Sequence, residues 1–405
     1  MELEDDILDT SLLKLDGDFN AQVDYILRNV RLSRAEVENL RWLFSDLEQT
    51  LQRAWPGCLV MPFGSIVTGL GIKTSDADCY VSIPNHLQVP GDKYVMQAKY
   101  TLMKYSSNFR ELFAITEAKV PIVKCYHVPT NCHCDVSFTS ISGIRNSQLI
   151  SLLLHTDTKT LPLAVLIKYW SKVHDLTGTN KLPNYTLTMM VIFYLQQLKV
   201  LPSVIQLQTN KETIMVDGWN TSFNWDLNFE STNNMSLYKL LGGFFEYYNN
   251  FDFKQNIVSP YLGTPLSVES FKEIRTVPKQ FVLYKQNVIN GVCKPFNIKA
   301  TICIQDPFDH SRNTSGGVYR RMADSFLSQL KYAAVVYKEC SENKFLEAIL
   351  VKKLNISHPI GNNMNTVNMK RPSKIRKRNK KNKHVHNNLQ SVYIEMNKIM
   401  KNNRR

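Results

Sequence analysis

PFGSIVTGLGIKTSDADCYVSI, at residues 62–83, is the stretch of sequence that decides the fold. Its two acids, Asp76 and Asp78, stand at the start of an apolar run that ends at Ile83. If this run is a β-strand, the two-residue period places both carboxylates on one face. Two neighbouring carboxylates repel each other, so a fold keeps them together mainly where a cation binds between them. The pair therefore predicts a site for a hard metal ion.

A glycine-serine pair precedes the two acids and follows a first apolar run at residues 59–61. A turn at Gly64 and Ser65 presents backbone N–H groups and a hydroxyl, which suit an anion. A phosphate-binding turn beside a metal site indicates nucleotide chemistry.

Length and composition are those of a soluble globular protein with two domains. The chain has 405 residues, of which 43% are hydrophobic and 21% charged. The first residues, MELEDDILD, lack the basic-then-apolar order of a signal peptide. No run reaches the roughly 18 apolar residues that a transmembrane helix needs, so we expect no membrane partner. We expect the eight cysteines to be free thiols in a reducing compartment.

The formal charge of +14 is concentrated near the C-terminus. Residues 370–405 contain 13 Lys or Arg and one Glu, a net +12, which leaves +2 for residues 1–369. Residues 354–388 are rich in Asn, Lys and Arg with few apolar residues, which predicts disorder. The nine basic residues at 370–383 suit a polyanion, and they are equally typical of a nuclear import signal. We therefore expect the protein in the cytoplasm, the nucleus or both.

Hydrophobic periodicity predicts an α+β fold in which a small mixed sheet packs on a larger helical domain. Residues 1–54 are predicted to be helices that pack on the helical domain, and residues 346–405 to be the basic, largely disordered tail. Between them, residues 55–150 form the sheet domain and residues 151–345 the helical domain. The expected strands are 58–62, 77–83, 111–117, 120–127 and 133–139, with a helix near 92–106.

The metal site needs a third carboxylate, and Asp135 is the best candidate. It stands in an otherwise apolar and small-residue strand, where an unpaired charge is costly. If this strand lies beside the strand of Asp76 and Asp78, three carboxylates meet and can hold two Mg²⁺ or Mn²⁺ ions. Two such ions stabilise the attacking and leaving oxygens of an in-line displacement. The alternative is a solvated turn at Asp76 and a salt-bridged Asp135, but the preceding Gly-Ser turn favours catalysis.

Three segments, FGS at 63–65, SDAD at 75–78 and CDVSF at 134–138, resemble the nucleotidyltransferase superfamily that includes DNA polymerase β. The helical region narrows the resemblance to the terminal RNA nucleotidyltransferases, the poly(U) and cytoplasmic-type poly(A) polymerases, over residues 40–340. The resemblance implies that Ser65 contacts a triphosphate and that the three aspartates bind the metal ions. It also implies a poly(A)-polymerase-associated segment at residues 237–300.

The same resemblance implies further nucleotide-binding residues. Asn146 and Ser147 take the place of a ribose-binding pair, and Tyr185 that of a tyrosine that stacks on the base. Lys168 and Lys172, four residues apart, project from one helical face and suit a triphosphate. The full predicted nucleotide-binding set is Gly64, Ser65, Asn146, Ser147, Lys168, Lys172, Asn184, Tyr185, Asp306, His310 and Arg312.

The choice of base is expected to depend on the Asp-Pro-Phe motif at residues 306–308. In uridylyltransferases of this family a His six residues after the Asp reads uracil, whereas here that position is Arg312 and a His stands at His310. A guanidinium can still donate to a uracil carbonyl, so we expect template-independent addition of UMP from UTP to RNA 3′ ends. Relatives that add adenosine generally lack the His, so a poly(A) polymerase that uses ATP stays open.

Two alternatives outside RNA tailing also stay open: a primer-independent oligonucleotide synthase and a catalytically inactive RNA-binding scaffold. The sequence contains no obvious RNA-selecting module, so choice of the RNA target is expected to need a protein partner.

Overall fold

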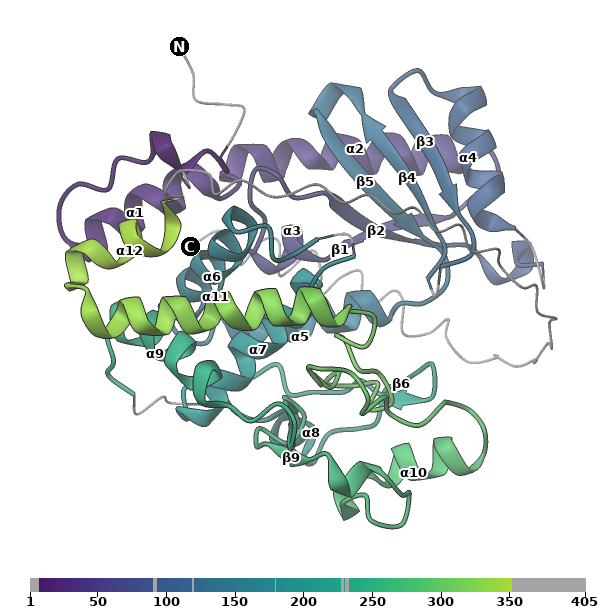
Figure 1. Cartoon of the computed structure of the whole chain (residues 1–405). Coiled ribbons are helices and arrows are strands. Elements are labelled where there is room, and N and C mark those ends of the chain that lie inside the picture. The colour runs from purple at the N-terminus through teal and green to yellow at the C-terminus, as the bar shows by residue number, and fades with distance from the viewer. Residues whose placement is uncertain are drawn as a thin grey trace, which may run out of the picture. The chain divides into compact units, whose positions relative to one another are not determined.

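The stretch at residues 62–83 forms the end of one strand, a short helix, a loop and the next strand (Figure 1). β1 (Leu59–Phe63) and β2 (Ala77–Ser82) are antiparallel, and Phe63 lies opposite Asp78. The structure, a computed structural model, describes residues 7–351 apart from 90–92, 119, 179, 227–228 and 230–232. The basic run at 370–383 therefore lies outside the described residues.

The sheet has five strands in the order β1-β2-β5-β4-β3. β5 (Cys132–Ser137) runs parallel to β2, whereas β4 (Ile122–His127) and β3 (Phe109–Ile115) continue the sheet antiparallel. The predicted mixed sheet is confirmed, with strand bounds that differ from the expected ones by two residues or fewer.

One face of the sheet is buried against two helices, α2 (Arg34–Leu51) and α4 (Tyr94–Tyr105). Alternation along the strands explains this, because Cys79, Val123 and Val136 face the helices and are fully buried. The neighbouring residues on the other face, among them the predicted aspartates, are partly exposed.

The remaining helices pack around α7 (Asn184–Gln197), which is apolar on nearly all sides and buried over most of its length. The longer helices of this layer are α1 (Phe19–Val30), α5 (Ser142–Leu154), α6 (Thr160–Val173), α9 (Leu237–Asn250), α11 (Arg320–Glu339) and α12 (Glu342–Leu350). Shorter elements are α3 (Ser65–Thr68), α8 (Val204–Gln208), α10 (Val282–Ile289), β6 (Met215–Val216), β7 (Trp219–Asn220), β8 (Asn256–Ile257) and β9 (Leu266–Ser267). Single 3₁₀ turns occur at Thr10–Leu12, Asn85–Leu87, Val128–Thr130, Glu269–Phe271 and Lys279–Phe281.

Two expectations about the chain ends differ from the structure. Residues 1–54 are predicted to pack on the helical domain, and α1 and the segment before it do so, whereas α2 buries Leu40, Leu43 and Leu47 against the sheet. These leucines recur every three or four residues, a pattern that shows an apolar face but not its partner. The predicted tail at 346–405 begins too early, because α12 extends to Leu350 and buries Phe345 and Leu350.

No helix among the described residues is both long and apolar enough to span a membrane.

Candidate active site

The strand register brings the three predicted acids together on the open face of the sheet. Asp78 in β2 lies directly opposite Asp135 in β5. Asp76 precedes Asp78 by two residues and therefore points to the same face. Lys124 in β4 lies opposite Asp135 on its other side. A row of charged side chains thus crosses three neighbouring strands.

Lys124 forms ion pairs with two of these acids. Its Nζ lies 2.9 Å from Asp135 Oδ1 and 3.8 Å from Asp76 Oδ2. The role of this residue is not evident from the sequence, because only the pairing of β4 with β5 shows that it faces the acids. The strand alternation at 122–127 was the available signal, but it does not say which strand lies next to which.

The carboxyl group of Asp78 is strongly perturbed. Burial raises its pKa to about 7, and the like charges of Asp135 and Asp76 add to this, while Lys168 and Lys124 oppose it. Burial also raises the pKa of Asp135, against the opposing effect of Lys124. The three carboxylates are therefore held together at an electrostatic cost that a bound cation would relieve.

The three acids fit a hard divalent cation. They offer only oxygen ligands, and the Lys124 ammonium already lies between two of them, where positive charge is favoured. Among the described residues, no three His, Cys, Asp or Glu side chains are grouped so that they could hold a metal ion by themselves. An incomplete site is typical of Mg²⁺ in nucleotide-binding proteins, because the ion keeps several waters and takes one or two carboxylates plus phosphate oxygens.

The Gly-Ser turn between β1 and α3 lies directly against Asp78. Gly64 has a φ of +78°, and a Cβ atom on it would lie 2.3 Å from Asp78 Oδ2. Its N–H donates to Ser147 Oγ at 2.8 Å, and that hydroxyl donates to the Gly143 carbonyl at 2.8 Å. Ser147 therefore holds the turn onto α5, and because it also lines the pocket described below, its contact with the sugar stays a prediction.

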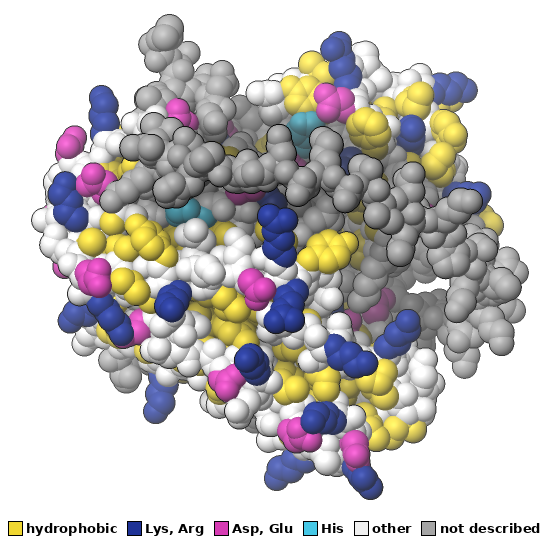
Figure 2. All heavy atoms as spheres, in the orientation of Figure 1, with side chains coloured by type: hydrophobic (Ala, Val, Ile, Leu, Met, Phe, Trp, Pro, Cys, Tyr) yellow, Lys and Arg dark blue, Asp and Glu magenta, His cyan; other side chains and the backbone are white. Residues whose placement is uncertain are grey.

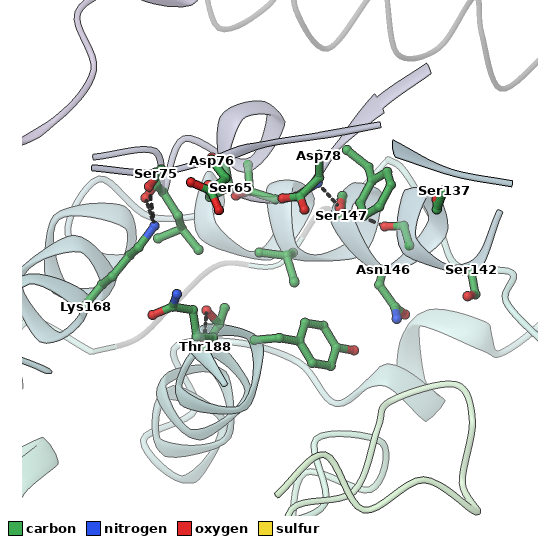
Figure 3. Close-up of a pocket in the computed structure, with 18 of the residues that line it drawn as sticks. Ser65, Ser75, Asp76, Asp78, Ser137, Ser142, Asn146, Ser147, Lys168 and Thr188 are labelled. Carbon is green, nitrogen blue, oxygen red and sulfur yellow. Dashed lines mark hydrogen bonds between the residues drawn. The ribbon is translucent and has the colours of Figure 1, made fainter. Parts of the chain in front are cut away.

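A pocket of about 510 Å³ opens between the sheet and the helices α5, α6 and α7 (Figure 3). It brings together most of the residues predicted from the sequence. Those that line it are Gly64, Ser65, Asp76, Asp78, Asn146, Ser147, Lys168, Lys172, Asn184, Tyr185 and Arg312. Asp135, Asp306 and His310 are not part of the lining.

Asn146 presents an unused hydrogen-bonding group to the pocket. Its side chain projects from α5 into the space that Figure 3 shows, and the residue is 8% exposed. Its Oδ1 has no hydrogen-bond partner among the described residues. Because a buried, unpaired amide oxygen is costly, this atom is suited to a donor on a bound ligand.

Lys168 is a buried cation at the end of the pocket near Asp76. It is 7% exposed, and its Nζ donates to the Leu70 carbonyl at 2.8 Å and to Ser75 Oγ at 3.0 Å (Figure 3). Burial, assisted by Lys172, lowers its pKa to about 7. Near neutral pH, Lys168 is therefore only partly protonated in the free protein, and a triphosphate bound beside the two lysines would favour its charged form.

The depressed pKa of Lys168 predicts a specific pH dependence of stability. Between about pH 7 and the ordinary lysine pKa of 10.5, the unfolded chain binds a proton at this residue that the folded chain lacks. The free energy of unfolding therefore gains a contribution that rises with pH across this window. Urea unfolding at pH 7, 8 and 9 in EDTA should show a steeper rise for the natural chain than for Lys168→Met. Parallel pH profiles for the two proteins would contradict the buried charge.

Tyr185 and Arg312 are held together by Asp306, just behind the pocket wall. The Tyr185 hydroxyl donates to Asp306 Oδ2 at 3.1 Å, and Arg312 Nη1 lies 3.6 Å from the same oxygen. The Arg312 guanidinium carbon lies 5.6 Å from the centre of the Tyr185 ring. Asp306 is 1% exposed and also accepts from the N–H groups of Phe308 and Asp309. It acts as an anchor for two pocket residues.

His310 does not reach the pocket, although it is predicted to contact the base. Its ring lies among Trp219, Tyr261 and Phe281, with centroid distances of 5.6, 4.0 and 5.1 Å. Burial lowers its pKa to about 3, so the ring is neutral at physiological pH. Of the two residues after the Asp-Pro-Phe motif, only Arg312 lines the site.

The pocket also contains residues that the sequence did not single out. Most of these residues are Ser or Thr, and their spacing in the sequence forms no recognisable motif. They are Thr68, Thr74, Ser75, Ser137, Ser140, Ser142 and Thr188.

Comparison with known proteins matches two segments of the chain. Residues 19–154 match the family described as "Poly(A) RNA polymerase, mitochondrial-like, central palm domain". Residues 236–312 match "Cid1 family poly A polymerase". The chain belongs to the terminal RNA nucleotidyltransferases. The sequence resemblance is thus confirmed, and the second match overlaps the expected segment at 237–300.

Relatives within this family differ in the nucleotide that their names specify. The chain is 30% identical to the mitochondrial poly(A) RNA polymerase of Drosophila melanogaster, over 71% of this chain and 53% of the relative. It is 27% identical to human terminal uridylyltransferase 7, over 69% of this chain and 18% of the relative. The chain thus spans about half or less of these curated relatives.

The fold is that of a solved family member. The Cid1 poly(U) polymerase, in a crystal structure with magnesium and 3′-dATP, superimposes with a TM-score of 0.66 at 24% identity. The match covers 80% of this chain and 95% of the Cid1 chain. This likeness confirms the α+β architecture of a small sheet packed on helices.

Proposed function

We propose that the chain adds nucleoside monophosphates to RNA 3′ ends without a template. The observation that carries the proposal is the single pocket in which the acid pair, the Gly-Ser turn, two lysines and Tyr185 meet. In the reaction, the RNA 3′-hydroxyl loses its proton, and its oxygen forms a bond to the α-phosphorus of a nucleoside triphosphate. The bond from that phosphorus to the bridging oxygen breaks, and pyrophosphate leaves.

Each part of the pocket suits one part of the triphosphate. Lys168 and Lys172 supply the charge that a leaving pyrophosphate needs, and the turn at Ser65 supplies N–H and hydroxyl donors. The Asn146 amide suits the ribose hydroxyls, and the Tyr185 ring offers a stacking surface to the base. Divalent cations held by the three aspartates would stabilise charge on the attacking and leaving oxygens.

We further propose that UTP is the preferred substrate, because of Arg312. A guanidinium has only donors, so it favours a base that presents a carbonyl oxygen and disfavours one that presents an amino group. Uracil and guanine carry such a carbonyl at the position where cytosine and adenine carry an amino group. The Arg312 guanidinium lies over the Tyr185 ring, 5.6 Å from its centre, and lines the same pocket, so a base that stacks on this ring would lie next to it.

The proposal is tested by incubating a 5′-labelled single-stranded RNA with each triphosphate separately. We expect extension by UTP to be most efficient and GTP to be used better than CTP. Extension mainly by ATP would instead support the poly(A) polymerase alternative, which the name of the Drosophila relative favours. Products formed from triphosphates alone would identify a primer-independent synthase.

Replacing Arg312 by methionine tests the role of the guanidinium. We expect the ratio of kcat/KM for UTP to that for ATP to fall about tenfold, since a site built around one hydrogen bond loses its discrimination without it. Arg320→Met is the matched control, because the Arg320 side chain is 87% exposed on α11. An unchanged ratio in Arg312→Met would exclude this residue from base selection.

A further inference from the structure

The open face of the sheet continues beyond the metal-binding acids, across β4 to the edge strand β3. The residues opposite one another on neighbouring strands share a face, so Phe113 in β3 lies on the same side as Lys124 and Asp135. One row further along, Arg110 lies opposite Tyr126. The aspartates are thus the start of a longer surface, which we call the β3–β4 face and define by Arg110, Phe113, Ile115, Lys124 and Tyr126.

A β-bulge shapes this surface. Arg110 and Phe113 are three residues apart, so in a regular strand they would point to opposite faces. The pairing shifts between them, and Glu111 takes a φ of +50° in the shifted segment. The extra residue turns both side chains to the face of Asp135, which is the known effect of a bulge.

The β3–β4 face exposes an aromatic ring rather than burying it. Phe113 is 62% exposed and Ile115 is 38% exposed, whereas Val123 and Cys125 on the other face are buried under the helices. Figure 2 shows hydrophobic side chains interspersed with basic, acidic and histidine side chains on the part of the surface where β3, β4 and α4 lie. An exposed phenylalanine flanked by Arg110 and Lys124 combines a stacking surface with positive charge.

The position of this face matches the side from which an acceptor must approach. An in-line displacement requires the attacking and leaving oxygens on opposite sides of the phosphorus. Lys168 and Lys172, which suit the leaving pyrophosphate, line the pocket together with the acid pair of β2. Asp135 and Lys124 lie outside the pocket lining, on the side that is left for the attacking oxygen. Val120, in the β3–β4 connection, does line the pocket, so the face begins at the edge of the nucleotide site.

We propose that the 3′-terminal segment of a single-stranded RNA acceptor binds on the β3–β4 face, with one base stacked on Phe113 and its phosphates beside Arg110 and Lys124. Stacking of unpaired bases on aromatic side chains of an open sheet is a general mode of RNA binding. This inference rests on the proposed function, because it assigns the second substrate of the same site.

RNA binding without catalysis tests the proposal directly. The full chain, in EDTA, is titrated into a 5′-fluorescein-labelled RNA of about ten uridines, and anisotropy gives the Kd. We expect Phe113→Ala to raise the Kd about tenfold, the usual effect of removing one stacking ring. Phe113→Trp should restore binding, whereas Phe113→Leu, which keeps apolar bulk without a ring, should not.

Tyr100→Ala is the matched control, because Tyr100 is 60% exposed on α4, which covers the opposite face of the sheet. We expect it to leave the Kd unchanged. In steady-state extension assays, Phe113→Ala should raise the KM for RNA and leave the KM for the triphosphate unchanged. Thermal melts of all variants establish that the folded state is retained.

Three outcomes would overturn the proposal. The first is a Kd for Phe113→Ala equal to that of Tyr100→Ala. The second is full restoration by Phe113→Leu. The third is a selective loss in Trp42→Ala, since Trp42 is 69% exposed beside a separate groove that also reaches Asp76. A chain that binds RNA as expected but extends it with none of the triphosphates would contradict the proposed function and leave the RNA site intact.

Discussion

Replacing Asp78 by asparagine is expected to lower nucleotide transfer roughly a thousandfold or more, because it removes a carboxylate that holds the catalytic cations. The same change is expected to raise the melting temperature of the metal-free protein at pH 8. Asp78 lies partly buried beside Asp135 and Asp76, and its pKa, raised to about 7, shows that the folded state disfavours its charge. Above this pH the whole penalty is present in the natural chain, and asparagine removes it. Extension assays and thermal melts in EDTA measure the two effects.

Asp324→Asn is the matched control for this substitution. Its side chain is 59% exposed on α11, and its ion pair with Arg320 spans 3.9 Å. We expect neither the activity nor the melting temperature to change. Activity of Asp78→Asn within tenfold of the natural chain would remove this acid from the metal site. Calorimetric titration with Mn²⁺ adds a measurement that does not depend on catalysis. We expect the affinity for Mn²⁺ to fall in Asp78→Asn and to stay unchanged in Asp324→Asn.

Gly64→Ala is expected to lower transfer about a hundredfold. The added Cβ would lie 2.3 Å from Asp78 Oδ2, so either the turn or the carboxylate must move. A displacement of about 1 Å at a catalytic group can cost this much. The backbone adds a second penalty, because Gly64 has a φ of +78° and a ψ of −150°, a conformation that only glycine adopts readily.

Gly291→Ala separates these two effects. Gly291 also has a positive φ, at +67°, but a Cβ there would meet nothing within 4 Å. We expect it to lower the free energy of unfolding by about 1 kcal/mol and to leave transfer unchanged. If both alanine variants lose the same stability and neither loses activity, the close approach of the turn to Asp78 has no catalytic consequence.

Much of the site was predictable because several of its functional side chains lie within a few residues of one another in the sequence. The spacing of Asp76 and Asp78 and the Gly-Ser turn before them each follow from a few adjacent residues. The two lysines on α6 share a face by helical periodicity alone. Asp135 was also predictable, since an unpaired carboxylate in an otherwise apolar strand is costly. Only the parallel pairing of β5 with β2, however, places it opposite Asp78.

What the sequence did not reveal depends on which surfaces meet. The ion pair of Lys124 with Asp135 can be predicted only if the order of the strands is known. The packing of α2 on the sheet can be predicted only if it is known which of two apolar surfaces the helix contacts. His310 and Arg312 stand two residues apart after the same motif, but only Arg312 lines the pocket. Chain reversal at residues 306–312 turns His310 into an aromatic cluster, and no local pattern signals that turn.

The most direct test of the account compares two RNAs that differ only at the 3′ terminus. The purified chain is incubated with Mg²⁺, UTP and a 5′-labelled single-stranded RNA that ends in either a 3′-hydroxyl or a 3′-phosphate. We predict stepwise lengthening of the 3′-hydroxyl RNA, no lengthening of the 3′-phosphate RNA, and release of one pyrophosphate for each nucleotide added. Failure to extend the 3′-hydroxyl RNA with any of the four triphosphates, or equal extension of both RNAs, would contradict it.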